Sequence, residues 1–311
     1  MLFVACGDDT TPDAARDSGD DVEERLDADD GEDSGEDAAL VDADEADAQD
    51  SGPSACDEAL PVRGGSIAEP DLDELSGLVA SRTQPGVYFA INDSGDPDIF
   101  AMDETGAALG RYHLDGARNR DFEDITIGPG PGGGDYVYVG DVGDNQARIG
   151  GDARDEVQVY AVPEPIVGES FATLSDVLTY RYTYETPVDV EAIAIDTDGS
   201  LVVLTKENGT SRLLRAPLQE GPTQMEFVME RPFPLVTAMD FTSAGLLVRT
   251  YGDIYHFANL GDVATSYASE FRRGRPGAEF QGEAIAWRAD GSGLVTASEG
   301  AAAPVFVYEC P

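Results

Sequence analysis

The feature that most constrains the fold of this chain is a repeat with a period near 46 residues. Five segments begin alike, each leading into a short apolar run: LSGLVAS from Leu75, FEDITIG from Phe122, VEAIAID from Val190, VTAMDFT from Val236 and GEAIAWR from Gly282. Their third residues, 77, 124, 192, 238 and 284, are separated by intervals of 47, 68, 46 and 46 residues. A recurring unit of about 40 to 50 residues built from several strands is typical of a β-propeller blade.

Each repeat divides into four short strands. The second gives DITIG, DYVYVGDVG, VQVYAVPEP and VLTYRYTYE, and the third gives EAIAID, LVVLTKE, SRLLRAPL and QMEFVME. Apolar runs of this length between Gly, Asp and Pro turns indicate an all-β domain. The interval of 68 residues then represents one blade with longer loops, including the turn GPGPGGGD at 128–135. We predict one β-propeller domain over 56–311 with five four-stranded blades, six being the alternative.

The start of the chain differs in character from this domain. Residues 2–6, LFVAC, resemble the end of a bacterial lipoprotein signal peptide, in which a small residue precedes the Cys that is lipidated. We expect residues 1–6 to be the remnant of such a signal, with Cys6 lipidated and the true start codon upstream of Met1. The alternative is an accidental apolar start. We therefore predict a lipid-anchored protein of the cell envelope or the extracellular space, on the periplasmic or the surface face of the membrane.

Residues 7–55 form an acidic segment with 20 Asp and Glu against Arg16 and Arg25. Since it has almost no large apolar side chains, we expect a disordered tether. The run from Asp27 to Asp37 is similar to a calcium loop, but Gly31 stands at its fifth ligand position and a bidentate Glu at the twelfth is missing. We therefore expect diffuse counterion attraction there. The formal charge of the whole chain, −43, argues against nucleic acid as a partner.

Strand counting and cysteine counting lead to the same closure of the ring. The last repeat supplies AIAWRA, GLVTASE and PVFVYEC but no fourth strand, whereas DEALPVRGGSI precedes the first blade. If this N-terminal strand completes the last blade in antiparallel pairing, no sheet edge stays open and Cys56 comes opposite Cys310. The chain has three Cys, so lipidation of Cys6 leaves the same two for a disulfide. The alternative is two unpaired thiols.

The sequence resembles a family of secreted, mostly uncharacterised bacterial β-propellers related to the NHL, TolB-like and calcium-dependent phosphotriesterase propellers. The similarity spans about 70–311. The segments that carry it are NDSGD (92–96), DFEDI (121–125), GDVGDN (140–145), VYAVPEP (159–165), DVEAI (189–193), TKE (205–207), RTY (249–251), QGEAI (281–285) and SEG (298–300). The resemblance implies the propeller fold and no established catalytic residue. Related propellers often have six blades, whereas five repeats can be counted here.

Polar side chains gather at two equivalent places in the repeats. In a propeller, the loop that enters the innermost strand and the exit of the second strand open on the same face. Entering loops carry Glu74, Asp121, Glu123, Asp189, Glu191, Thr237, Gln281 and Glu283, and the exits carry Asn92, Asp93, Asp141, Asp144, Asn145, Lys206, Glu207, Arg249 and Glu299. One mouth of the channel should therefore carry a ring of carboxylates. Hard oxygen ligands of this kind are what Ca²⁺ prefers.

These residues divide into three predicted roles. The proposed calcium ligands are Asp93, Asp121, Asp141, Asp144, Asn145 and Asp189, with GDVGDN the best single candidate for a ligand loop. The candidate general bases are Glu123, Glu191 and Glu283, and the candidate ion-pair or substrate contacts are Lys206, Glu207, Arg249 and Glu299. The alternative is that these groups only cap turns and pair with one another.

Two functions remain open at this point. The first is a lipid-anchored binding or scaffold module whose acidic mouth binds a cation. The second is a calcium-dependent hydrolase of the phosphoesterase or lactonase type. The only histidines, His113 and His256, fall in outer strands, which argues against a Ser-His-Asp triad or a zinc site at the mouth. We expect a monomer that meets the membrane through its lipid alone and binds a protein or a small molecule.

Overall fold

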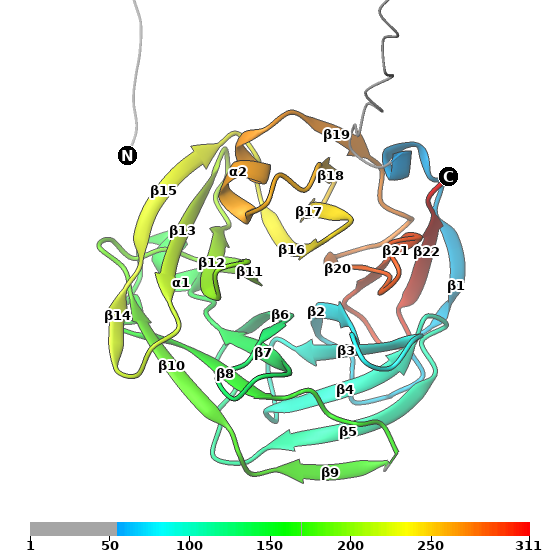
Figure 1. The fold of residues 1–311 in the computed structure, drawn as a ribbon, viewed down its shortest axis with the longest axis horizontal. Coiled ribbons are helices and arrows are strands. Elements are labelled where there is room, and N and C mark those ends of the chain that lie inside the picture. Colours follow the sequence, from blue (N-terminus) through cyan, green and yellow to red (C-terminus); the bar gives the residue numbers. More distant parts are fainter. Residues whose placement is uncertain (1–54, 169) are drawn as a thin grey trace, which may run out of the picture. The chain divides into compact units, whose positions relative to one another are not determined.

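The computed structural model describes residues 55–168 and 170–311. In this part of the chain nearly all regular structure is β-strand, arranged as five sheets around a central axis (Figure 1). Each sheet is one blade and is numbered here from the first repeat onward. The prediction of an all-β propeller with five four-stranded blades is confirmed. Cys6 and residues 7–54 lie outside the described residues, and Ala55 begins the short 3-10 helix η1 (Ala55–Glu58).

The first two blades each carry a fifth strand on their outer edge. Blade 1 contains β2 (Leu75–Ala80), β3 (Val87–Asn92), β4 (Asp98–Asp103), β5 (Ala108–Leu114) and β9 (Phe171–Leu174). Blade 2 contains β6 (Phe122–Pro129), β7 (Asp135–Asp141), β8 (Val157–Pro163), β10 (Leu178–Thr183) and β14 (Pro222–Gln224). Both β9 and β14 pair in parallel and come from the repeat that follows. They cover edges that would otherwise present unpaired backbone groups.

The other three blades have four strands each. Blade 3 contains β11 (Val190–Ile195), β12 (Ser200–Thr205), β13 (Ser211–Pro217) and β15 (Glu226–Arg231). Blade 4 contains β16 (Val236–Thr242), β17 (Gly245–Thr250), β18 (Ile254–Phe257) and β19 (Phe271–Gly274). Blade 5 contains β20 (Gly282–Trp287), β21 (Gly293–Ser298), β22 (Pro304–Glu309) and β1 (Val62–Ser66).

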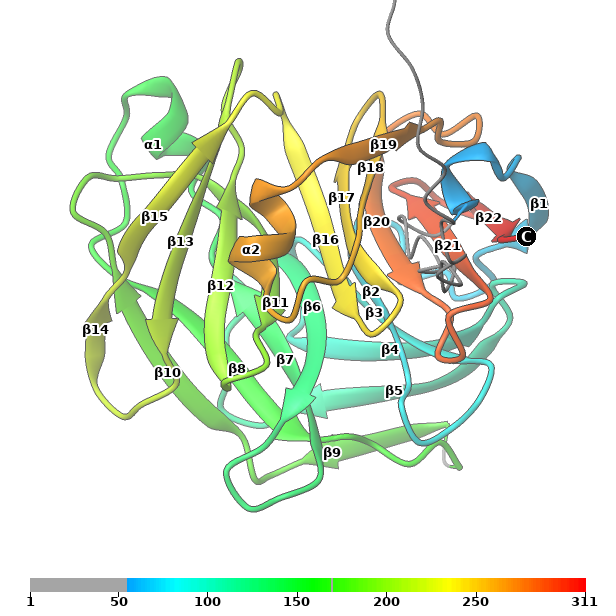
Figure 2. The ribbon, with the colours of Figure 1, turned by 45° about the horizontal axis from the view of Figure 1, so that its top comes forward.

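Within residues 55–168 and 170–311, two short α-helices interrupt this pattern. Helix α1 (Asn145–Ile149) follows β7 and projects from one face of the ring, and α2 (Val263–Ala268) lies between β18 and β19 (Figure 2). The long second repeat is thus one blade, as predicted, and its extra length forms α1, the turn at 128–135 and β9. Among the described residues, no helix combines the length and apolar character needed to cross a bilayer.

The ring closes as the sequence predicts. Strand β1 pairs antiparallel with β22, and Val62 lies opposite Val307. Cys56 and Cys310 form a disulfide across a sequence separation of 254 residues. The fourth strand of the last blade therefore comes from the start of the domain, and both ends of the ring are held by hydrogen bonds and by a covalent bond.

The apolar core lies between the blades. Among the described residues there are five clusters of buried apolar side chains, and each of them joins two neighbouring blades. Tyr138 and Tyr182 belong to the cluster between blades 2 and 3. Trp287 is buried between blades 4 and 5, where its Nε1 donates to the Gly245 carbonyl oxygen at 3.1 Å. These aromatic side chains therefore pack between neighbouring blades.

Candidate functional site

A β-bulge occurs at the same place in all five innermost strands. The register between the innermost strand and its neighbour skips the second residue of β2, β6, β11, β16 and β20. A bulge redirects the extra residue away from the regular alternation of the strand. The skipped residues are Ser76, Glu123, Glu191, Thr237 and Glu283, and all of them are buried. The bulge therefore creates a ring of five equivalent positions at one mouth of the channel.

These five positions are filled in two different ways. In blades 1 and 4 a hydroxyl donates to the backbone of the next blade, from Ser76 Oγ to the Phe122 carbonyl oxygen at 2.9 Å and from Thr237 Oγ1 to that of Gly282 at 3.1 Å. In blades 2, 3 and 5 the position holds a glutamate, which has no proton to donate when ionised. The glutamates therefore need a cation or a proton to be stable there.

The residues that directly follow the second strands form another set at this mouth. They are Asp93, Val142, Lys206, Tyr251 and Glu299. The Lys206 Nζ lies 2.8 Å from Glu191 Oε2, and the ammonium lies over the Tyr251 ring, 5.1 Å from its centroid. Burial lowers the pKa of Lys206, but the charges of Glu191 and Glu283 outweigh this effect, and the net pKa is raised. Lys206 is thus a fixed positive charge in the acidic mouth.

Three carboxylates come together beside this ammonium. One oxygen each from Glu123, Asp189 and Glu191 lie within 4.8 Å of one another, close enough to hold a metal ion. All three residues are at most 7% exposed. Asp189 also accepts a hydrogen bond from the Asp144 backbone N–H at 2.8 Å. By contrast, Glu191 Oε1 is buried and has no hydrogen-bond partner among the described residues. Carboxylate oxygens are suitable ligands for Ca²⁺.

The electrostatics of this cluster favour a bound cation. Burial, followed by the charges of Glu191 and Asp121, holds the pKa of Glu123 well above its usual range. Burial raises the pKa of Glu191 to about 8 in spite of Lys206. Closer to the rim, burial and the Glu74 carboxylate raise the pKa of Asp93 to about 7. A cation among these groups would stabilise their ionised forms.

The loop GDVGDN is held largely by protein groups. Arg154 Nη1 donates to Asp141 Oδ1 at 3.1 Å, and its Nη2 lies 3.0 Å from Oδ2. The two oxygens of Asp144 accept hydrogen bonds from the backbone N–H groups of Ala147 at 3.1 Å and Arg154 at 2.6 Å. Asn145 is exposed at the start of α1. The structure therefore does not bring these three residues into the cluster of Glu123, Asp189 and Glu191.

Two of the predicted ion-pair residues have partners outside the cluster. Arg249 is fully buried, with Nη2 2.8 Å from Glu279 Oε2 and Nη1 donating to the Ala284 carbonyl oxygen at 3.1 Å. Glu207 Oε1 accepts from Arg212 Nε at 2.6 Å. Arg154, Glu279 and Tyr251 were missed as functional positions by the sequence reasoning. Tyr251 could have been found from its place directly after a second strand, whereas no spacing marks Arg154 or Glu279.

The other predicted residues line the rim of the mouth. Asp121 lies close to Gly143, where an added Cβ would come within 2.6 Å of the Asp121 Cγ and 2.0 Å of Glu123 Oε1. Burial raises the pKa of Asp121 and of Glu299. Glu299 Oε2 accepts a hydrogen bond from Gln281 Nε2 at 2.6 Å. These acids surround the cluster without being part of it.

An opening connects the cluster to solvent. This pocket has a volume of about 250 Å³ and is lined by Ala147, Pro187, Val188, Asp189, Lys206, Glu207, Asn208 and Arg212. Asp189 and Lys206 thus contact both the buried carboxylates and the space that a ligand could enter. The opening is large enough for a small polar group beside a bound ion.

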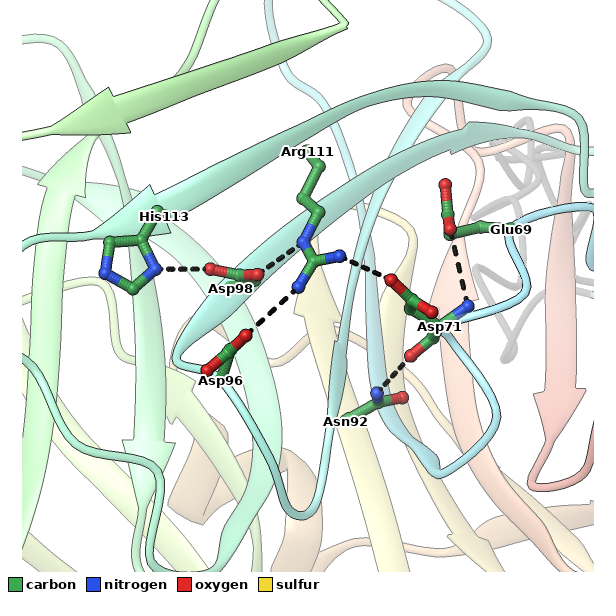
Figure 3. A network of polar contacts seen from close by, with 7 residues as sticks. All are labelled: Glu69, Asp71, Asn92, Asp96, Asp98, Arg111 and His113. Atoms are coloured by element: carbon green, nitrogen blue, oxygen red, sulfur yellow. Dashed lines mark hydrogen bonds and ion pairs between the residues drawn. The ribbon is translucent and has the colours of Figure 1, made fainter.

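A second polar pocket is lined by residues of blade 1 and the loops beside it, among them Asp71, Asp96 and Arg111. Figure 3 shows the network of polar contacts that these residues make. Arg111 Nη1 lies 2.7 Å from Asp71 Oδ2 and Nη2 lies 3.5 Å from Asp96 Oδ2, while Nε bonds to Asp98. The other oxygen of Asp98 is 2.7 Å from His113 Nδ1. These acidic and basic side chains pair with one another, and their ion pairs connect β4 and β5 to the loop before β2. His113 lies in this network and His256 is buried in blade 4, so neither histidine belongs to the carboxylate cluster.

Comparisons with known proteins assign no family to this chain. No protein-family model matches the chain, and no curated protein sequence matches it significantly. Among solved structures, the PQQ-bound aldose sugar dehydrogenase of Streptomyces coelicolor is similar with a TM-score of 0.48 and 12% identity, over 83% of this chain and 100% of that one. The Cps50 (Swd1) β-propeller domain of Myceliophteria thermophila gives 0.43 and 10%, over 81% and 100%.

Raptor of Chaetomium thermophilum is also similar, with a TM-score of 0.41 and 12% identity over 80% of this chain. The chain covers 29% of the length of Raptor. These likenesses concern the fold alone, and the chemistry of the site rests on the residues described above.

Proposed function

We propose that this protein is a binding propeller whose acidic mouth holds one divalent cation, most suitably Ca²⁺, as part of the surface that recognises its ligand. The observation that carries the proposal is the buried cluster of Glu123, Asp189 and Glu191 with the unpartnered oxygen of Glu191. A buried acidic oxygen without a partner is costly, and a cation would offset that cost.

A thermal melt with and without calcium tests the proposal. A ligand at 100 times its Kd stabilises the folded state by about 2.7 kcal/mol, which corresponds to a rise in Tm of roughly 5 to 10 °C for a domain of this size. The rise should be abolished in Glu191→Gln and kept in Glu226→Gln, a control on the exposed strand β15. An unchanged wild-type Tm in calcium and in chelator would contradict the proposal.

A calcium-dependent phosphoesterase or lactonase is the second candidate, and the opening lined by Asp189 and Lys206 favours it. The cation would polarise a phosphoryl or carbonyl oxygen of the substrate. Among the three candidate bases, Glu123 and Glu191 belong to the carboxylate cluster, whereas Glu283 stands outside it and could take a proton from water. Glu283→Gln should then abolish hydrolysis of phosphoester or lactone substrates while the calcium-dependent rise in Tm persists. A hydrolase activity that survives this variant excludes Glu283 as the base.

We further propose that the protein is exported as a monomer and anchored by a lipid on Cys6. The disulfide between Cys56 and Cys310 supports an oxidising compartment. Cys6→Ala should move the protein from the membrane fraction to the soluble fraction. Wild-type protein that fractionates as soluble would argue against the anchor.

A further inference from the structure

Lys206 occupies a position in the mouth that has the features of a cation site. Its Nζ is 2.8 Å from Glu191 Oε2, and the face of the Tyr251 ring lies on another side. Glu283 occupies the bulge position in blade 5 that Glu191 occupies in blade 3, and its charge raises the pKa of Lys206. The Lys206 side chain is 9% exposed, so little water shares this space. Carboxylates are ligands of metal cations, and an aromatic face is a favourable contact for an ammonium group.

Glu191 connects this position to the proposed metal cluster. Its Oε2 bonds to Lys206, whereas its buried Oε1 has no partner, and the residue belongs to the cluster with Glu123 and Asp189. An ion in the cluster and the Lys206 ammonium would therefore share one carboxylate. At such short range, like charges disfavour each other strongly because a buried site screens them poorly.

The fold itself shows that an ion pair is not required at the five bulge positions of the ring. The equivalent positions in blades 1 and 4 hold Ser76 and Thr237, whose hydroxyls bond to the backbone of the next blade. A ring that served stability alone could use this solution in every blade. A buried ion pair carries a desolvation cost that the hydroxyl solution avoids. The glutamates and Lys206 therefore indicate a role in binding a cation rather than in stability alone.

We propose that Lys206 is a built-in counter-ion that fills a second cation position between Glu191 and Glu283 and so restricts the mouth to one divalent ion. This inference rests on the proposed cation-binding function. In their ionised forms, Glu123, Asp189, Glu191 and Glu283 bring four negative charges. With the Lys206 ammonium present, one divalent ion leaves a single negative charge, and a second ion would give an excess of positive charge. Without Lys206, two divalent ions balance the four carboxylates.

Calcium titration by calorimetry tests this on the full, disulfide-bonded chain. The wild type should bind one Ca²⁺ per protein at the mouth and Lys206→Met should bind two, or bind the first at least about tenfold more tightly. Lys206→Arg keeps the charge and should behave as the wild type. Lys206→Met combined with Glu283→Gln removes one charge of each sign and should return the stoichiometry to one.

The outcomes separate this inference from the proposed function. If the wild type and Lys206→Met both bind one ion with equal affinity, or if the variant loses binding, the counter-ion role is overturned while cation binding by the wild type stands. Binding by the variant alone would support the counter-ion role and contradict cation binding by the wild type. Binding by neither overturns both.

The same variant remains informative if it is unstable. Without the ammonium, the buried Glu191 carboxyl loses its ion-pair partner, so Lys206→Met should melt lower than the wild type in chelator and recover in calcium. A circular dichroism melt measures both conditions. Failure to fold in calcium as well as in chelator would overturn the counter-ion role, because calcium would then be unable to replace Lys206.

Discussion

The disulfide between Cys56 and Cys310 should contribute an unusually large part of the stability of this domain. It joins residues 254 apart in sequence, and almost the whole propeller lies inside the loop that it closes. On the loop-entropy model, closing a loop of this length stabilises the folded state by about 5.5 kcal/mol at 25 °C. At roughly 2 to 4 °C per kcal/mol, its loss should lower Tm by about 10 to 20 °C.

The variant that tests this carries Cys56→Ser and Cys310→Ser together, in a Cys6→Ser background that leaves no thiol for exchange. Strand β1 can still pair with β22, so the ring should remain closed and the far-UV circular dichroism spectrum unchanged. Differential scanning calorimetry measures Tm. Guanidinium unfolding should also give a larger m value, since the unfolded chain without the cross-link is less compact. A fall in Tm below about 3 °C, with m unchanged, would refute the loop-entropy reasoning.

Three further predictions concern the mouth and the buried charges. Gly143→Ala should weaken calcium binding at least about tenfold, because the new Cβ would lie 2.0 Å from Glu123 Oε1 and displace it. A calorimetric titration measures the Kd, and a Kd equal to that of the wild type would contradict the site geometry. Burial lowers the pKa of His256 from 6.5 to about 4, so on acidification the unfolded state takes up a proton before the folded state does, and the free energy of unfolding should fall by up to about 3 kcal/mol between pH 6.5 and pH 4. Urea unfolding at several pH values measures this fall, and His256→Leu should lack it. An equal pH dependence in the wild type and in His256→Leu would contradict the prediction. Arg249→Met leaves the buried Glu279 carboxylate without its ion-pair partner and should lower the free energy of unfolding, measured with denaturant, by about 3 to 5 kcal/mol. Adding Glu279→Gln should restore part of this free energy. If nothing is restored, lost packing rather than the unpaired charge explains the destabilisation.

Much of the fold could be predicted because its signals are periodic along the chain. The residues Glu123, Glu191 and Glu283 recur at the second position of their repeats, from which the sequence predicts equivalent places at one mouth. The structure places them at the bulges of β6, β11 and β20, which the sequence did not predict. The pairing of Cys56 with Cys310 followed from counting strands and cysteines. Both kinds of information are one-dimensional and need no knowledge of side-chain positions.

The composition of the site could be predicted less well. Asp141 and Asp189 look equally suitable in the sequence. Asp141 ends a second strand, and Asp189 directly precedes an innermost strand. Arg154 engages Asp141, whereas Asp189 joins the carboxylate cluster. Arg249 and Lys206 are both basic residues at the ends of second strands, yet the first is buried against Glu279 between blades and the second faces the mouth.

The sequence by itself determined the five-bladed ring, its closure and the face on which acidic side chains collect. Only the tertiary structure decided which acids share a site and which are neutralised by a nearby arginine. The physical reason lies in the range of the interactions. Strand period and repeat length are local properties, whereas an ion pair depends on distances of about 3 Å between side chains that belong to different loops and blades.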